Sequence, residues 1–210
     1  MKRFFDVTVG LVASVVTLPL VALLMLASLV SFRANPCFAQ ERVGLGGSRF
    51  RLCKVRSLPT AVGAAVDKYE LANQPTTRFG AFIRRTHIDE LPQLWSVVSG
   101  SMSLVGPRPE MPHLAERFGA AQRAAREPFR PGCVGLWQAS EHNDGLMYEH
   151  PEYDLAYAAN QSLALDLYIV WRTAIMEFGG PRLRLADVPK WLLPNPYVGA
   201  ADGAAVEATA

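Results

Sequence analysis

The chain has 210 residues, a length that suits one domain with an appendage and allows a sizeable buried core. Half of its residues are hydrophobic and 19% are charged, which excludes a disordered chain. The net charge is only +2, yet the segment from Arg33 to Arg108 contains 11 Lys or Arg and 5 Asp or Glu. Such a segment favours contact with anionic lipid headgroups or phosphorylated substrates, although an ordinary solvated face has the same composition.

The first element is an uncharged apolar run from Val7 to Val30, with basic residues on both flanks. About 20 apolar residues span a bilayer as a helix, so this run is long enough. Pro19 lies near its middle, where proline removes a hydrogen bond and bends a helix. Two interpretations stay open: a bent spanning helix, and a re-entrant helix-break-helix, which the basic flanks favour. A cleaved signal peptide is a weaker third, because its apolar core would be shorter.

The next segment, from Asn35 to Ser57, alternates apolar and polar residues around three glycines, which predicts a short β-hairpin. On its second arm we expect three apolar residues to face the core, namely Phe50, Leu52 and Val55. We expect three cations to point outward, namely Arg51, Lys54 and Arg56. The arm is either an ordinary basic strand or a direct substrate contact. Pro59 to Pro75 is predicted to be a mobile loop or a weak helix.

The stretch from Arg84 to Glu110 carries the most chemistry. Asp89 and Glu90 are adjacent carboxylates, which repel each other unless a cation or a reaction partner uses them. Arginines lie on both sides, and a guanidinium fork matches phosphate oxygens. The pattern therefore predicts a metal-and-phosphate site. A helix is expected from Leu91-Pro92 to Gly100, with both carboxylates at its N-terminal end, where helix capping is the alternative role.

The second half is expected to be mainly helical. His113 to Glu127 is either an amphipathic helix on a membrane surface or a plain surface helix. Tyr153 to Phe178 reads as a packed or interfacial helix pair, because four charged residues interrupt it. The chain after Gly179 is predicted to be loosely attached. The fold class is therefore α+β and mainly helical, with a small β-hairpin and amphipathic interfacial helices.

Cysteine and histidine spacing gives no sign of a structural metal. Cys37, Cys53 and Cys133 are odd in number and form no CxxC pattern, so reduced thiols facing the cytoplasm are the simplest interpretation. His142 and His150 are too far apart in sequence to argue for a metal pair.

Several short motifs follow one another in a fixed order. The apolar helix broken at Pro19 follows Lys2-Arg-Phe-Phe-Asp6. The others are Gln40–Gly44, Phe50 with Lys54-Val-Arg56-Ser57, Asp89-Glu-Leu-Pro-Gln-Leu94, Met102-Ser-Leu-Val-Gly-Pro-Arg108-Pro-Glu110, Arg130-Pro-Gly132 and Trp137-Gln138. In this order and spacing they resemble the bacterial sugar transferase family, in its small form that holds only the catalytic domain. The resemblance runs from about Lys2 to Gly180.

The resemblance implies a phosphoglycosyl transferase. Such an enzyme moves a sugar phosphate from a nucleoside diphosphate sugar, typically a UDP-sugar, to undecaprenyl phosphate and releases nucleoside monophosphate. Asp89 would be the nucleophile and form an aspartyl-phosphosugar intermediate. Glu90, with Asp89, would bind Mg2+. Arg108 would clamp phosphate, with Arg85 and the further cations Arg130, Lys54 and Arg56 as other candidates.

The resemblance also implies a place in the cell and a division of the chain. It favours the re-entrant helix over 1–34, a cytosolic catalytic domain over 35–180 and a Pro/Ala-rich tail over 181–210. The protein would sit in the bacterial inner membrane, facing the cytoplasm, at the first membrane step of exopolysaccharide, O-antigen, capsule or glycoprotein glycan assembly. Its partners would be the donor sugar nucleotide, undecaprenyl phosphate and membrane lipids, without nucleic acid. Homo-oligomerisation stays open.

Three departures from the family pattern bear on activity. His87-Ile88 replaces a Ser or Thr followed by Leu, and Ser101 replaces a common acidic residue. After Gln138 the family often has a Gly-Arg pair, whereas this chain has Glu141-His142-Asn143 after Ser140. The last change bears on the donor, so no sugar is predicted. Two alternatives remain: a catalytically impaired membrane scaffold of the same fold, and an exported protein with a cleaved leader.

Overall fold

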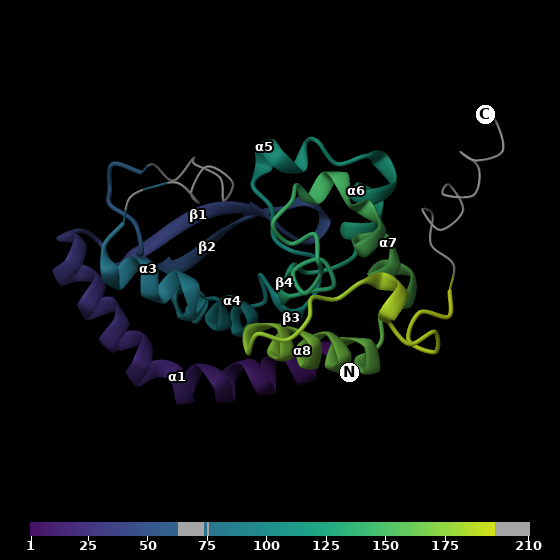
Figure 1. The fold of residues 1–210 in the computed structure, drawn as a ribbon, viewed down its shortest axis with the longest axis horizontal. Helices are drawn as coiled ribbons and strands as arrows, with labels where there is room; N and C mark the ends of the chain where they lie inside the picture. Colours follow the sequence, from purple (N-terminus) through teal and green to yellow (C-terminus); the bar gives the residue numbers. More distant parts are fainter. Residues whose placement is uncertain (63–73, 75, 196–210) are drawn as a thin grey trace. The chain divides into compact units, whose positions relative to one another are not determined.

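A computed structural model of the chain describes residues 1–62, 74 and 76–195, which form two compact units (Figure 1). The first unit comprises Met1–Arg42 and Arg49–Met102. The second comprises Val43–Ser48 and the chain from Ser103 onward. Most of the predicted loop between Pro59 and Pro75 lies outside the described residues.

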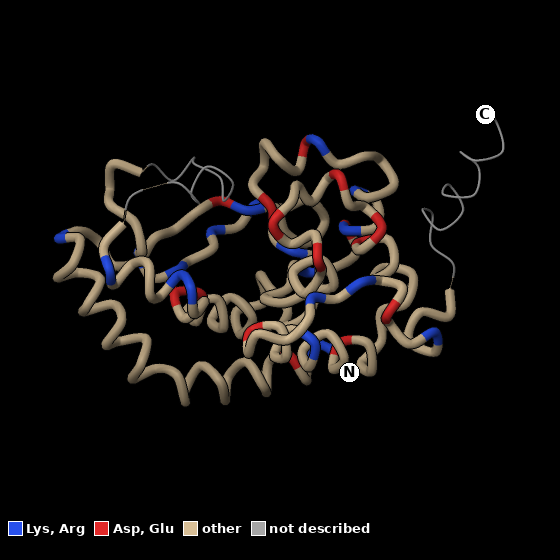
Figure 2. Tube along the Cα trace, viewed as in Figure 1, with Lys and Arg blue, Asp and Glu red and all other residues tan. Residues whose placement is uncertain are grey.

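The first unit begins with the helix α1 (Lys2–Phe32), which contains Pro19 and bends along its length (Figure 1). The backbone stays helical through the proline, so α1 is one bent helix and not the two separate helices of a helix-break-helix. Of the helices that the structure describes, α1 alone is long and apolar enough to cross a membrane. No Asp, Glu, Lys or Arg lies in α1 after Asp6, and Figure 2 shows its long uncharged stretch.

The burial pattern of α1 is the reverse of that of an ordinary surface helix. The residues that it buries are mostly small or polar, namely Asp6, Gly10, Ser14, Leu24 and Ser28. Many of its large apolar side chains are exposed, among them Val12, Val16, Leu23 and Val30. A Cβ on Gly10 would lie 3.1 Å from Val97, so the glycine allows close packing on the helix α4 (Gln93–Ser99). Small residues at a helix interface and apolar residues outside are typical of helices in lipid.

The predicted hairpin is present as the strands β1 (Cys37–Val43) and β2 (Arg49–Val55). Leu52 and Val55 are buried as expected, and Phe50 is half-buried. A disulfide joins Cys37 to Cys53, whose Cα atoms are 6.2 Å apart. The expectation of reduced thiols is therefore wrong for this pair, because strand pairing brings together two cysteines that are distant in sequence.

The rest of the first unit carries the acidic pair. The helix α3 (Arg78–Arg85) is capped at its N-terminus by Thr77, whose hydroxyl accepts a hydrogen bond from the Gly80 N–H. A 3-10 turn, η2 (Ile88–Glu90), follows, and then α4, which ends at Gly100 in a left-handed conformation (φ 99°). The predicted helix end is confirmed. The carboxylates lie in the separate turn before α4, because Leu91 and Pro92 intervene.

The second unit is built around a pair of parallel strands, β3 (Ser103–Val105) and β4 (Gly132–Val134), in which Ser103 pairs with Gly132. The helices of this unit are α5 (Pro112–Ala115), α6 (Ala120–Arg126), α7 (Pro151–Asn160) and α8 (Leu163–Glu177). Its 3-10 turns are η1 (Leu45–Gly47), η3 (Met147–Glu149) and η4 (Leu185–Asp187).

Two expectations for this unit change and one is confirmed. The predicted helix from His113 to Glu127 is two short helices, because the chain leaves the helical path before Gly119. The helix pair is confirmed as α7 and α8. The segment 181–195 is packed rather than loose. Leu183, Val188 and Leu192 belong to the apolar core of the unit, and the Asn195 N–H donates to Asn160 Oδ1 at 2.7 Å.

Candidate active site

The acidic pair is presented by a turn with an apolar anchor on each side. After α3 the backbone reverses at His87, which has a left-handed φ of 53° that non-glycine residues seldom adopt. Ile88 and Leu91 then pack against a small core of Leu24, Val55 and Ile83. Asp89 and Glu90 lie between these two anchors, and Asp89 is only 7% exposed. Packing on both sides therefore fixes the position of the carboxylates.

Glu90 is held through both of its carboxylate oxygens. Lys54 Nζ is 2.6 Å from Oε1, and Gln93 Nε2 donates to Oε2 at 2.9 Å. Lys54 was expected to bind substrate phosphate, and here it is the ion-pair partner of Glu90. Gln93 was not predicted as a site residue, although residues three apart on a helical turn face each other, which is a signal that could have identified it.

Asp89 is the residue whose acidity departs most clearly from normal among those near the turn. Burial raises the pKa of Asp89 to about 6, and the negative charge of Glu90 raises it further. The positive charge of Lys54 lowers this pKa, as do His87 and Arg84 to a smaller extent. A buried carboxylate with a raised pKa is typical of a functional site. Arg84 is the arginine whose charge acts on Asp89, whereas the predicted Arg85 is exposed at the end of α3.

The donor set of this turn suits a hard divalent cation. Mg2+ is usually bound by one or two carboxylates together with waters and substrate phosphates. Asp89 and Glu90 supply such oxygens on one turn, and burial raises the pKa of Asp89. The residues present therefore fit Mg2+, with Lys54 as a neighbouring positive charge.

The predicted cation Arg56 lines a cavity of about 590 Å3 at the start of the hairpin. Its Nε donates to the Asn35 carbonyl at 2.7 Å, and its guanidinium lies 5.8 Å from the centroid of the Phe38 ring. Arg51 also lines the cavity. The cavity thus combines two guanidinium groups with an aromatic face, a combination that can hold an anionic ring compound.

The remaining predicted cations, Arg108 and Arg130, belong to the second unit, where their two turns touch. A Cβ on Gly106 would lie 2.5 Å from the Arg130 carbonyl oxygen and 3.0 Å from the Gly132 nitrogen, so only glycine fits there. The Arg108 guanidinium lies 5.9 Å from the Trp137 ring centroid. Its Nε is buried and meets no hydrogen-bond acceptor among the described residues. An uncompensated guanidinium of this kind suits an anion.

A support for Arg108 was not predicted from the sequence. Arg126 on α6 donates to the Arg108 carbonyl and forms an ion pair with Asp154 on α7, with Nη1 2.7 Å from Oδ2. Gln122 also donates to Asp154 at 2.8 Å. The only sequence signal was the Ala- and Arg-rich composition of this segment, which gives no partner for any one arginine.

Comparison with known proteins places these residues in a family. Residues 1–180 match the family described as bacterial sugar transferase. The chain is 39% identical over 190 residues to the UDP-galactose-lipid carrier transferase of Erwinia amylovora, covering 82% of this chain and 39% of that protein. It is 36% identical over 180 residues to the UDP-glucose:undecaprenyl-phosphate glucose-1-phosphate transferase of Caulobacter vibrioides, covering 82% and 67% respectively. It is 32% identical over 188 residues to the exopolysaccharide production protein ExoY of Rhizobium meliloti, covering 82% and 83%.

The match includes every candidate residue described above. The chain spans about two fifths of the length of the Erwinia protein, whereas it spans most of ExoY. Because the family match covers most of the chain, the protein belongs to the bacterial sugar transferase family.

Proposed function

We propose that this protein transfers a sugar phosphate from a nucleoside diphosphate sugar to undecaprenyl phosphate through a covalent aspartyl intermediate. The observation that carries the proposal is the buried carboxylate of Asp89, with its pKa of about 6, next to a Glu90 held by Lys54 and Gln93. The names of the Caulobacter and Erwinia relatives describe transfer from UDP-sugars to a lipid carrier. A UDP-sugar is therefore the donor class that we propose.

In the first step, an Asp89 carboxylate oxygen attacks the β-phosphorus of the donor. The new oxygen–phosphorus bond forms as the bond from that phosphorus to the bridging oxygen breaks, and nucleoside monophosphate leaves. In the second step, a phosphate oxygen of undecaprenyl phosphate attacks the same phosphorus, and the Asp89 carboxylate is the leaving group. Two displacements at one phosphorus replace a single difficult transfer. Asp89 must be ionised to attack, which a pKa of about 6 permits at neutral pH.

We assign Glu90 and Asp89 as the groups that would hold Mg2+. When bound, Mg2+ neutralises charge on the diphosphate and on the leaving group. Glu90 is oriented for this by Gln93, and Lys54 balances the acidic pair. We assign Arg108 and Arg130 to the substrate phosphates, because the Nε of Arg108 meets no acceptor in the part of the chain that the structure describes.

We propose that α1 lies in the membrane as a re-entrant helix. Its exposed Val and Leu side chains and its small, partly polar buried face support insertion in lipid. The bend of α1, which contains Pro19, and the basic flanks support entry and exit on the cytoplasmic face of the inner membrane. The helix α8 adds an interfacial face, because Leu163, Leu167, Val170 and Trp171 are exposed at helical spacing.

The deciding experiment measures nucleoside monophosphate release from a panel of UDP-sugars with Mg2+ and undecaprenyl phosphate. Wild type is expected to release it with one donor, and Asp89→Asn is expected to lose at least about 1,000-fold in rate, because the nucleophile is gone. Asp144→Asn is the matched control, since Asp144 is an exposed carboxylate of the second unit.

A second readout tests the covalent step directly. Without undecaprenyl phosphate, intact-mass measurement should show wild type carrying one added sugar phosphate and Asp89→Asn carrying none. Turnover retained in Asp89→Asn would show that the nucleophile is misassigned. No release by wild type from any donor would favour a scaffold with lost activity or a donor outside the panel, and binding of the panel separates these two.

A further inference from the structure

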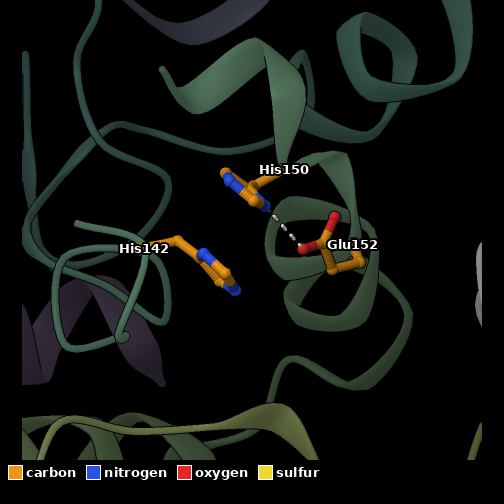
Figure 3. A group of neighbouring side chains, drawn as sticks. All are labelled: His142, His150 and Glu152. Atoms are coloured by element: carbon orange, nitrogen blue, oxygen red, sulfur yellow. Dashed lines mark hydrogen bonds and ion pairs between the residues drawn. The ribbon is translucent and has the colours of Figure 1, made fainter. Parts of the chain in front are cut away.

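Three potential metal ligands meet in the second unit, outside the candidate active site. His142, His150 and Glu152 each offer one ligand atom, and these atoms all lie within 4.8 Å of one another (Figure 3). His150 Nδ1 is 3.1 Å from Glu152 Oε1, and the two imidazole rings stack with centroids 3.9 Å apart. These histidines are eight positions apart in the sequence, and the fold brings their rings together.

Ordered backbone on both sides holds the cluster in place. The segment before His142 is fixed by the Glu141 N–H, which donates to the Leu183 carbonyl at 3.0 Å. The His142 N–H donates to Ser140 Oγ at 3.2 Å. His150 immediately precedes α7, and Glu152 lies in the first turn of that helix. The three ligands therefore join a loop to a helix end.

The side chains are accessible enough to exchange an ion with solvent. The exposed fractions of the His142, His150 and Glu152 side chains are 39%, 24% and 32%. Zn–N and Zn–O bonds are about 2.0–2.2 Å, so the donors of one tetrahedral ion lie up to about 3.6 Å apart. Small rotations of half-exposed side chains would bring all three donors within that limit.

We propose that His142, His150 and Glu152 bind a divalent transition-metal ion of the zinc class, at a site separate from the Asp89–Glu90 pair. Imidazole nitrogen with one carboxylate suits Zn2+ and its neighbours, whereas Mg2+ prefers oxygen ligands alone. Three protein ligands leave a coordination position for water or an anionic oxygen. The site therefore takes a different metal from the one proposed for the acidic turn.

Such an ion would stiffen the support of Arg108. Glu152 and Asp154 lie on the first turn of α7, and Asp154 pairs with Arg126, which donates to the Arg108 carbonyl. Fixing the loop to the start of α7 would restrain this chain of contacts. The proposal stands on the second unit alone and does not depend on the phosphoglycosyl transferase assignment.

The test is a Zn2+ titration of the full-length protein, purified without a polyhistidine tag, in excess Mg2+ that occupies the oxygen-ligand site. Calorimetry should show one Zn2+ per chain, and Co2+ should give the visible absorption of a site with nitrogen ligands. His142→Ala and Glu152→Gln should each weaken binding at least about tenfold, because one of three ligands is lost. His113→Ala is the matched control, since His113 is exposed on α5.

Two results would overturn the proposal. One is the absence of stoichiometric Zn2+ binding by wild type, which would leave a histidine stack with a hydrogen-bonded glutamate. The other is equal affinity in wild type and His142→Ala, in which one of the three proposed ligands is missing. Binding abolished by Asp89→Asn but kept in His142→Ala would place the ion at the acidic turn and would count against the proposal.

Discussion

Asp89 and Asp154 are both buried carboxylates, but the protein compensates their charges to different degrees. Asp154 is 3% exposed, and its Oδ2 lies 2.7 Å from Arg126 and 2.8 Å from Gln122. Asp89 is 7% exposed, and burial raises its pKa to about 6 despite the nearby positive charge of Lys54, whose Nζ is bonded to Glu90. A fully compensated carboxylate holds elements together, whereas an under-compensated one keeps its reactivity at a cost in stability.

The difference lies in how the cations are shared. In the second unit, Arg126 is bound directly to Asp154. In the first unit, Lys54 serves two adjacent carboxylates and is in contact with only one of them. This division is what we expect if Asp89 must reach a phosphorus atom while Glu90 stays in place. Substitution of either carboxylate, Asp154 or Asp89, tests this comparison.

The largest expected effect on stability comes from Asp154→Ala. It leaves the Arg126 guanidinium, whose side chain is 12% exposed, without its carboxylate and also strips Gln122 of an acceptor. Breaking a buried pair from one side costs about 3–5 kcal/mol, so the melting temperature in detergent should fall by several degrees or more. Calorimetric or fluorescence melting measures this directly.

The control for that change is an exposed pair of similar length. Asp144 Oδ2 lies 2.6 Å from Arg182 Nη1, but the two side chains are 78% and 43% exposed. Asp144→Ala should change the free energy of unfolding by about 1 kcal/mol or less, because solvent screens the pair. A similar loss in the two variants would mean that burial does not distinguish them, and the comparison would fail.

The opposite sign is expected for Asp89→Asn, which should make the protein more stable at neutral pH. The pKa of Asp89 rises from 3.8 to about 6 on folding, so the folded state binds more protons between these values. Stability attributable to Asp89 therefore falls as pH rises from about 4 to 6, and the loss is complete above that window. Asparagine removes the charge at nearly constant shape, so the gain at pH 7.5 should be about 1–3 kcal/mol.

The pH dependence separates this explanation from a change in packing. Near pH 4 the Asp89 carboxyl is largely protonated in the folded protein, so wild type and Asp89→Asn should then melt at closely similar temperatures. A stabilisation of equal size at pH 4 and pH 7.5 would contradict the assignment of a buried, under-compensated charge.

Local patterns predicted the elements of the first unit well. The hairpin follows from alternation around Gly44, Gly46 and Gly47, and the end of α4 follows from Gly100. The packed segment at 181–195 could not be predicted in the same way, because prolines interrupt the pattern of its apolar side chains. They find their partners only through long-range contacts such as the Ser140–Leu183 bridge.

In the candidate site, too, local sequence patterns predict some features, whereas others depend on long-range contacts. The sequence indicates Asp89, Glu90 and Arg108 as site residues, because adjacent carboxylates and a proline-flanked arginine are typical of a phosphate-binding site. The contact partner of each cation cannot be predicted from the sequence. Examples are the ion pair of Lys54 with Glu90 and the hydrogen bond from Arg126 to the Arg108 carbonyl. The His142–His150 stack joins residues eight positions apart through a loop whose path no local pattern specifies.

The smallest expected effect is on the pH dependence of turnover, which tests whether the ionisation of Asp89 limits the reaction. If attack requires ionised Asp89, kcat/KM should be nearly constant above pH 7 and about tenfold lower at pH 5, because a pKa of about 6 leaves roughly a tenth of the carboxyl ionised there. Four neighbouring groups influence the pKa of Asp89, namely Lys54, Glu90, His87 and Arg84, and the charge of Lys54 has the largest effect among them. The same profile is therefore measured in the variant Lys54→Met. Losing the attraction of Lys54 should move the acid limb of the profile to higher pH. A limb that stays in place would mean that a group other than Asp89 sets it.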